Sequence, residues 1–134
     1  MATLNTFQSD VILGSVQSSD LGYTVDEVTV TIQDGMKMGA ALELSGGKYI
    51  WVAAANVANT TAILIDPEAE GYDQENGVLP AGDYTLVVAK RGTTINLNKV
   101  TLSDSTDAAT IRAAADAFEV SGSNKVTDKV FGNQ

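Results

Sequence analysis

The chain has 134 residues, 44% of them hydrophobic and 19% charged, a size and composition that fit one globular domain with a single core. Its net charge of −9, with no cluster of Lys and Arg, argues against nucleic acid as a partner, because a phosphate lattice is bound by grouped cations. There is no Cys and no His, which excludes thiol nucleophiles, disulfides, the usual zinc sites and a Ser-His-Asp triad.

Residues 1–22 are polar, with a few apolar side chains spaced along them. We expect an extended N-terminal arm here; a frayed terminus is the alternative interpretation. Its candidate partner-binding residues are Phe7, Val11, Ile12 and Leu13. If the arm is separate from the core, deleting residues 2–13 leaves the core folded. No stretch has the length of a signal peptide or a membrane span, so we expect synthesis in the cytoplasm and no membrane partner.

The segment from Tyr23 to residue 65 predicts a series of short strands. Val28, Val30 and Ile32 alternate with polar residues, which is the period of a half-buried strand. Asp34-Gly35 predicts a turn, and Ser45-Gly46-Gly47 lies between two apolar runs and indicates a hairpin. Two further strands are expected at residues 48–54 and 60–65. Residues 23–134 are therefore predicted to form a single β-rich domain.

Residues 66–83 form the longest irregular segment and hold six carboxylates. The alternate spacing of Asp66, Glu68 and Glu70 is similar to that of a calcium loop. An EF-hand needs a Glu at the twelfth position, where this chain has Gly77. We interpret the segment as a solvated acidic loop, with a weak calcium site of another type left open, and we expect no cofactor.

Residues 82–102 predict two strands that flank a basic corner, Lys90-Arg91-Gly92. In the second strand the apolar positions change parity between Leu97 and Val100, so we predict a β-bulge near Asn98. The corner is interpreted as a strand end with its two cations in water; a functional role for Lys90 and Arg91 is the alternative.

One helix is predicted over residues 107–120. Residues 103–107 offer several N-caps, and Gly122 can end the helix. At helical spacing one face carries Ile111, Ala114, Ala115 and Phe118. The expected fold is α+β, mainly β: a small single domain of short antiparallel strands with one principal helix and the extended arm.

This order of elements resembles the head decoration (capsid cement) proteins of tailed phages, the lambda-like decoration family in particular. The matching parts are residues 1–22, 59–64 and 107–120 and the corner Lys90-Arg91-Gly92. The longer acidic loop and the strand at residues 25–35 depart from the lambda type. The resemblance implies a structural protein on the outside of a phage head, not an enzyme. It also implies a homotrimer whose partner is the major capsid protein, with the arm adding a strand to that partner and Lys90 and Arg91 meeting an acidic capsid surface.

The alternative is a β-sandwich adhesion or tail-fibre module. Residues 79–88, LPAGDYTLVV, are similar to a strand entry in such surface modules. Some of these modules carry a Lys–Asn isopeptide bond, for which the available residues are Lys48, Lys99, Asn96 and Asn98. The predicted helix and the lack of a secretion signal argue against this alternative. An enzyme would have to use a pair of carboxylates, and no pair stands out in the sequence.

Overall fold

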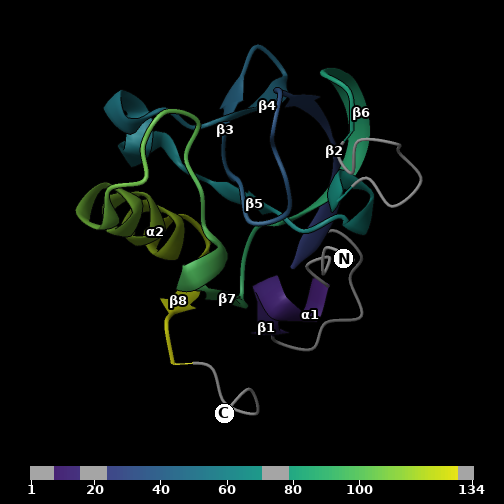
Figure 1. Cartoon of the computed structure of the whole chain (residues 1–134). Helices are drawn as coiled ribbons and strands as arrows, with labels where there is room; N and C mark the ends of the chain where they lie inside the picture. The colour runs from purple at the N-terminus through teal and green to yellow at the C-terminus, as the bar shows by residue number, and fades with distance from the viewer. Residues whose placement is uncertain (1–7, 16–23, 71–78, 130–134) are drawn as a thin grey trace, which may run out of the picture.

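The computed structural model describes residues 8–15, 24–70 and 79–129 (Figure 1). The elements in chain order are α1 (Gln8–Val11), β1 (Ile12–Ser15), β2 (Val25–Ile32), β3 (Ala41–Ser45), β4 (Lys48–Trp51), η1 (Ala54–Asn59), β5 (Ala62–Leu64), η2 (Pro67–Glu70), β6 (Gly82–Ala89), β7 (Thr93–Asn96), η3 (Leu97–Lys99), α2 (Ala108–Gly122) and β8 (Lys125–Thr127), where η marks a 3-10 helix. The predicted α+β, mainly β fold with one main helix is confirmed.

Five strands close into a barrel in the order β2-β4-β3-β5-β6. The longest pairing is antiparallel, between β2 and β6, and runs from Val25 opposite Ala89 to Ile32 opposite Gly82. β2 meets β4 in a parallel pair at Val30 and Tyr49. A closed barrel has no free strand edge, so it offers no place for another strand to add.

The hairpin between β3 and β4 forms where the sequence predicts it. Gly46 and Gly47 both have positive φ, 61° and 83°, as a tight two-residue hairpin turn requires. Leu44, near this turn, is 58% exposed although its partner across the hairpin, Tyr49, is buried. The hairpin therefore presents one large apolar side chain at the surface.

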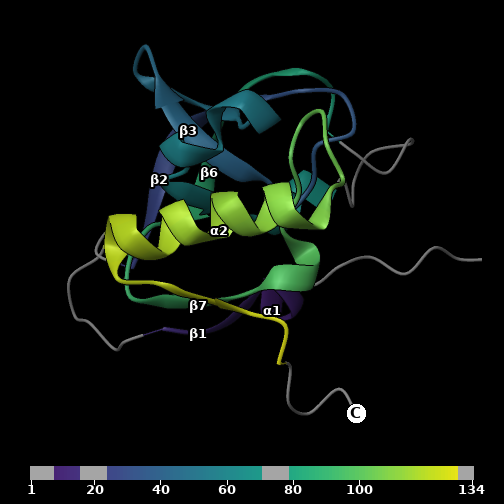
Figure 2. The ribbon, with the colours of Figure 1, turned by 90° about the vertical axis from the view of Figure 1, so that its left-hand side faces the viewer.

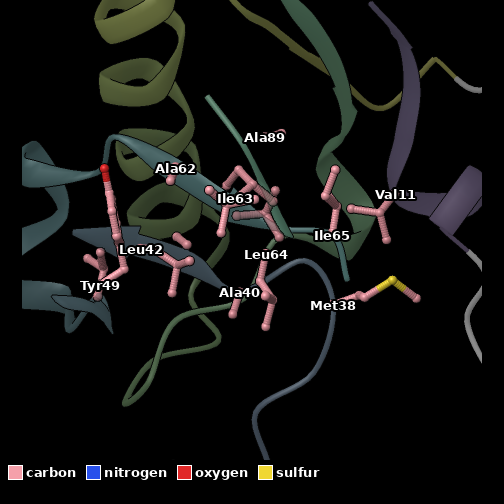
Figure 3. Close-up of a cluster of buried hydrophobic side chains, with 14 of the residues drawn as sticks. Val11, Met38, Ala40, Leu42, Tyr49, Ala62, Ile63, Leu64, Ile65 and Ala89 are labelled. Carbon is pink, nitrogen blue, oxygen red and sulfur yellow. The ribbon is translucent and has the colours of Figure 1, made fainter. Parts of the chain in front are cut away.

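Strand β5 is buried on both faces. Ala62 lies opposite Leu42, and Leu64 lies opposite Val88, which places these side chains on one face. Ile63, which alternates with them, lies on the other face and is also fully buried. Figure 3 shows this cluster. The core therefore has two layers, one on each side of this strand.

Helix α2 crosses one side of the domain, with the barrel on one side of it and the sheet that contains β7 on the other (Figure 2). Its N-cap is Asp107, whose carboxylate accepts the backbone N–H of Thr110. Ala114, Ala115 and Phe118 are fully buried, as the sequence predicts.

The helix ends after Gly122, but not because that glycine is left-handed: the αL residue is Ser123, with φ 53°. A Cβ on Gly122 would lie 2.2 Å from the carbonyl oxygen of Lys90. Gly122 is therefore required by the close approach of the helix end to the basic corner.

A three-stranded sheet in the order β1-β7-β8 lies beside the barrel, with β1 antiparallel and β8 parallel to β7. The predicted strand over residues 93–102 with a bulge near Asn98 is wrong in detail. β7 ends at Asn96, whose side chain accepts the N–H of Asn98 at 3.0 Å and starts the 3-10 turn η3. This turn, and not a bulge, changes the parity of the apolar positions, because Asn competes with the strand ladder for backbone donors.

Part of the predicted arm is folded onto the domain. Within residues 1–22 the structure describes residues 8–15, which form α1 and β1. Val11 is fully buried in the same cluster as Ile63 and Ile65 (Figure 3). Gln8 also donates its side-chain amide to the carbonyl of Ile65 at 3.0 Å. Residues 8–15 therefore do not form the expected extended arm. Their docking buries the apolar side chain of Val11 and lets β1 pair with the edge of β7.

Candidate partner-binding surface

The basic corner Lys90-Arg91-Gly92 is a junction between strands and the main helix. The backbone N–H of Lys90 donates to the carbonyl of Thr24 at 2.8 Å. The N–H of Gly92 donates to the carbonyl of Gly122, the last residue of α2, at 2.9 Å. The prediction of a strand-end corner is confirmed, and its backbone fixes the helix end against β6.

The cation of Lys90 is held within the domain and not in water as predicted. Its Nζ lies 3.6 Å from a carboxylate oxygen of Asp26 and 5.7 Å from the centre of the Tyr49 ring. Both contacts stabilise the charge of a lysine whose side chain is only 21% exposed. Arg91 is half-buried. Lys90, which follows β6, therefore connects that strand to β2 through Asp26 and to β4 through Tyr49.

Asn124 is a polar residue that sequence reasoning missed. It is 8% exposed, and its amide nitrogen donates to the carbonyls of Lys90 (2.9 Å) and Phe118 (3.0 Å). Its amide oxygen accepts the backbone N–H and the hydroxyl of Thr93, at 3.0 and 2.7 Å. One side chain thus joins the corner, α2 and the start of β7. No sequence pattern marks it, since its partners lie up to 34 residues away.

The structure brings some of the predicted site residues together along β7. Ile12 lies opposite Ile95, and Ser15 lies opposite Thr93, two residues after Arg91. Ile12 and Leu13 are half-buried, so part of each side chain is accessible. Val11 is fully buried and is not accessible to a partner while α1 stays docked. Phe7 lies outside the described residues.

This small sheet has two outer edges, β1 and β8. Within residues 8–15, 24–70 and 79–129, no strand pairs with either outer edge. Because the barrel is closed, these are the edges on which a further strand can add by backbone hydrogen bonds. Of the residues predicted as partner-binding, Ile12 and Leu13 therefore lie on a strand with an open outer edge.

A second surface feature is a shallow hollow of about 500 Å³ between α2 and η1, here called the α2–η1 hollow. It is lined by Val57, Ala58, Thr60, Thr61, Ala113, Asp116, Ala117, Val120 and Ser121. Val120 at its rim is 86% exposed. The sequence carried a signal that was missed: Ala113, Ala117 and Val120 are spaced at i, i+4 and i+7, a second apolar face on the same helix.

Ion pairs hold the side of α2 that faces β8. Arg112 donates to Asp116 at 2.9 Å, to Glu119 at 2.8 Å and to the carbonyl of Val126 at 3.1 Å. Burial disfavours the charge of Arg112, but the hydrogen bonds and charges of Asp116 and Glu119 outweigh it and raise the pKa of the guanidinium. On the barrel, hydrogen bonds from Lys48 and Thr31 lower the pKa of Asp83. Lys48, one of the residues considered for an isopeptide bond, is therefore ion-paired.

Two carboxylates of the acidic segment, those of Asp66 and Glu70, accept backbone N–H groups. Asp66 accepts the N–H groups of Glu68 and Val87, both at 3.0 Å, and Glu70 accepts that of Met38 at 3.2 Å. In the part of the chain that the structure describes, no group of three acidic side chains is placed to hold a metal ion. The described residues also contain no helix that is long and apolar enough to cross a membrane.

A family model described as the bacteriophage PhiTE minor capsid decoration protein matches residues 1–134. Searches of curated proteins and of solved structures found no match. Since the family match spans the whole chain, the chain belongs to this family of phage capsid decoration proteins. The resemblance to phage head decoration proteins is confirmed, and the family that matches is named for PhiTE and not for lambda.

Proposed function

We propose that this chain binds the outer surface of a phage capsid and stabilises the head as a cement protein, with the major capsid protein as its partner. The observation that carries the proposal is the family match to a minor capsid decoration protein over all 134 residues. The role is structural, so it depends on a stable domain and a contact surface and not on a catalytic centre. The chain would be made in the host cytoplasm and then join the exterior of the virion.

The contact surface that we propose is the outer edge of β1 with its flanking residues. A capsid strand that adds to this edge gains affinity from main-chain hydrogen bonds, while alternate side chains provide specificity. Ile12 and Leu13 are accessible in part, and Phe7 precedes α1 by one residue. Arg91 lies near the other end of the same pairing, two residues before Thr93. Val11 supports this surface from the core and does not contact the partner.

We further propose that the chain acts as a homotrimer at local three-fold positions. Three copies of one weak contact act together, because binding of the first raises the effective concentration of the other two. This arrangement lets a short edge such as the four residues of β1 supply a stable attachment.

The test is co-sedimentation of the purified chain with capsids that lack it, followed by heating of the decorated capsids. We expect the wild type to co-sediment and to raise the temperature at which capsids break. Leu13→Gln should weaken binding by about 10-fold, the effect of ~1.4 kcal/mol at the contact. Leu44→Gln is the matched control, since Leu44 is exposed on the barrel and outside the proposed surface. Circular dichroism must show both variants folded.

Failure of the wild type to bind capsids would contradict the proposed function. Equal binding of the Leu13→Gln variant and the wild type would retain the function but exclude this edge as the contact.

A further inference from the structure

We propose that Arg112 and Glu119 of α2 close the outer edge of β8 against strand addition, which prevents copies of this chain from joining edge to edge and leaves β1 free for its partner. The inference rests on the proposed function, in which the β1 edge binds the capsid, and adds the residues that restrict strand addition to that edge. It starts from two hydrogen bonds between α2 and the backbone of Val126, the central residue of β8.

Both backbone hydrogen-bonding groups of Val126 are bound by side chains and not by a strand. Its N–H donates to Oε2 of Glu119 at 2.9 Å, and its carbonyl accepts from Nη1 of Arg112 at 3.1 Å. Within a strand, the N–H and C=O of one residue point to the same edge, and those of the next residue point to the opposite edge. Since β8 is paired with β7 on its other side, the two side chains of α2 bind the edge that faces away from β7.

One acceptor and one donor of α2 thus take the place that a neighbouring strand would occupy. A strand paired at Val126 would accept its N–H with a carbonyl and donate an N–H to its carbonyl. A carboxylate and a guanidinium satisfy the same two groups. β8 has three residues, Lys125–Thr127, so Val126 is the residue in it whose backbone groups face outward. Occupation of this residue therefore closes the whole outer edge of β8.

The two side chains are also bound to each other. Nη2 of Arg112 donates to Oε1 of Glu119 at 2.8 Å, and Nε of Arg112 donates to Asp116 at 2.9 Å. Each oxygen of the Glu119 carboxylate thus has its own donor, and both side chains are partly shielded, Arg112 at 38% and Glu119 at 29% exposure. An incoming strand would have to displace several charge-assisted hydrogen bonds. The edge is therefore closed in the free protein, before any partner is present.

The strand most available to an opened β8 edge is β1 of a second copy. Within the described residues no strand pairs with the outer edge of β1. Addition of β1 to β8 would join two different surfaces of the chain, and a head-to-tail contact that does not close continues into long assemblies. Each such contact would also occupy the β1 edge that the proposed function assigns to the capsid. Arg112 and Glu119 therefore determine which edge of the sheet receives a strand.

The first experiment removes the pair without changing the net charge. Arg112→Ala/Glu119→Ala takes away one cation and one anion, so the charge stays at −9 and repulsion between copies is unchanged. Size-exclusion chromatography with light scattering, at increasing protein concentration, should show most of the wild-type species replaced by a series of larger ones. The matched control is Lys48→Ala/Asp83→Ala, which removes an ion pair of the barrel and is equally neutral; it should elute as the wild type does.

Two single variants separate an open edge from a weakened helix. Asp116→Ala removes a partner of Arg112 but keeps both bonds to Val126, so it should elute as the wild type does. Glu119→Ala frees the N–H of Val126 alone and should form the larger species to a smaller extent than the double variant. Circular dichroism must show each variant folded, and Glu119→Ala serves in place of the double variant if only the latter is unfolded.

The second experiment identifies the strand that adds. A fluorescent peptide with the sequence of residues 8–17 is titrated with each protein at concentrations too low for self-association. It should bind the double variant about 10-fold more tightly than the wild type, because a second edge is open. The control peptide carries Pro in place of Ile12 and Leu13, which removes two backbone donors, and should lose this difference.

The outcomes keep the two proposals apart, since neither experiment uses capsids. If the folded double variant elutes as the wild type does at every concentration and binds the peptide no more tightly, β8 is not a closed strand-addition site and the inference is wrong. The same conclusion follows if Asp116→Ala or the barrel variant forms the larger species, because loss of an ion pair would then be sufficient. In both cases the proposed function stands. A wild type that binds no capsid would contradict the proposed function and leave the closed edge of β8 in place.

Discussion

Asn124 shows how much of the domain depends on a single side chain. Its side-chain amide forms hydrogen bonds with the basic corner, with α2 and with the start of β7. All four donor–acceptor distances lie between 2.7 and 3.0 Å. The backbone and hydroxyl groups that bind this amide are largely shielded from water. When the amide is removed, water therefore cannot replace its hydrogen bonds. The position of Lys90 and Arg91 is therefore set by a residue more than thirty positions later in the chain.

We predict that Asn124→Ala lowers the free energy of unfolding by ~2–4 kcal/mol, since it leaves buried backbone groups unpaired. Urea unfolding followed by circular dichroism measures this. Asn59→Ala, at the exposed last residue of η1, is the control and should change stability by less than about 0.5 kcal/mol. If the two variants unfold at similar urea concentrations, the hydrogen bonds of Asn124 do not stabilise the corner Lys90-Arg91-Gly92.

Asp107 predicts a pH dependence at the start of α2. Hydrogen bonds from the hydroxyl and the backbone N–H of Thr110 lower the pKa of Asp107 below its ordinary value of 3.8. A lowered pKa in the folded state means that the charged form stabilises the fold. This contribution is complete above pH 3.8 and is lost as the pH falls through the lower, folded pKa.

Asp107→Asn retains a capping side chain but has no charge to interact with the helix dipole. At pH 7 this variant should melt at a lower temperature than the wild type, and the difference should shrink as the pH falls below 3.8 and through the lowered pKa of Asp107. A difference that stays constant with pH would mean that the charge of Asp107 has no part in stability.

At the scale of elements, the docking of α1 and β1 changes the design of a deletion test. Removing residues 2–13 takes away Val11, which is fully buried, and two of the four residues of β1. We expect this deletion to lower stability by ~2–5 kcal/mol, because it opens the core, which reverses the expectation drawn from the sequence. A deletion of residues 2–7 keeps both elements, so it should leave the melting temperature within a few degrees and weaken only capsid binding. Unchanged stability after the longer deletion would show that α1 and β1 are not part of the core.

The elements that could be predicted from the sequence are those specified by local residues. The alternation in β2, the Ser45-Gly46-Gly47 turn and the cap and apolar face of α2 each lie within a few consecutive residues, and each formed as predicted. Docking of Val11 could not be predicted in this way, because it depends on a core built by β5 and β7. The α2–η1 hollow is likewise created by two segments about fifty residues apart. In this chain, nearby residues determine the helices and strands, whereas packing between distant segments determines which side chains are exposed at the surface.

For the whole molecule, the first prediction concerns assembly. A homotrimer in solution would have a mass about three times the 14.0 kDa of one chain, measurable by light scattering during size-exclusion chromatography. The monomer mass together with tight capsid binding would mean that trimers form only on the capsid lattice. The monomer mass together with weak binding would contradict the homotrimer.

The second prediction for the whole molecule follows from its net charge of −9. If the capsid surface that meets this chain is cationic, the overall field of the chain should assist association, and salt screens that field. We expect the capsid affinity of the wild type to fall by about 10-fold between 50 and 500 mM NaCl, as the Debye length drops from ~14 to ~4 Å. The Leu13→Gln variant should keep the wild-type slope, because strand addition at β1 involves no formal charge. A wild-type affinity that is constant or rises with salt would show that the net charge of the chain does not assist its attachment to the capsid.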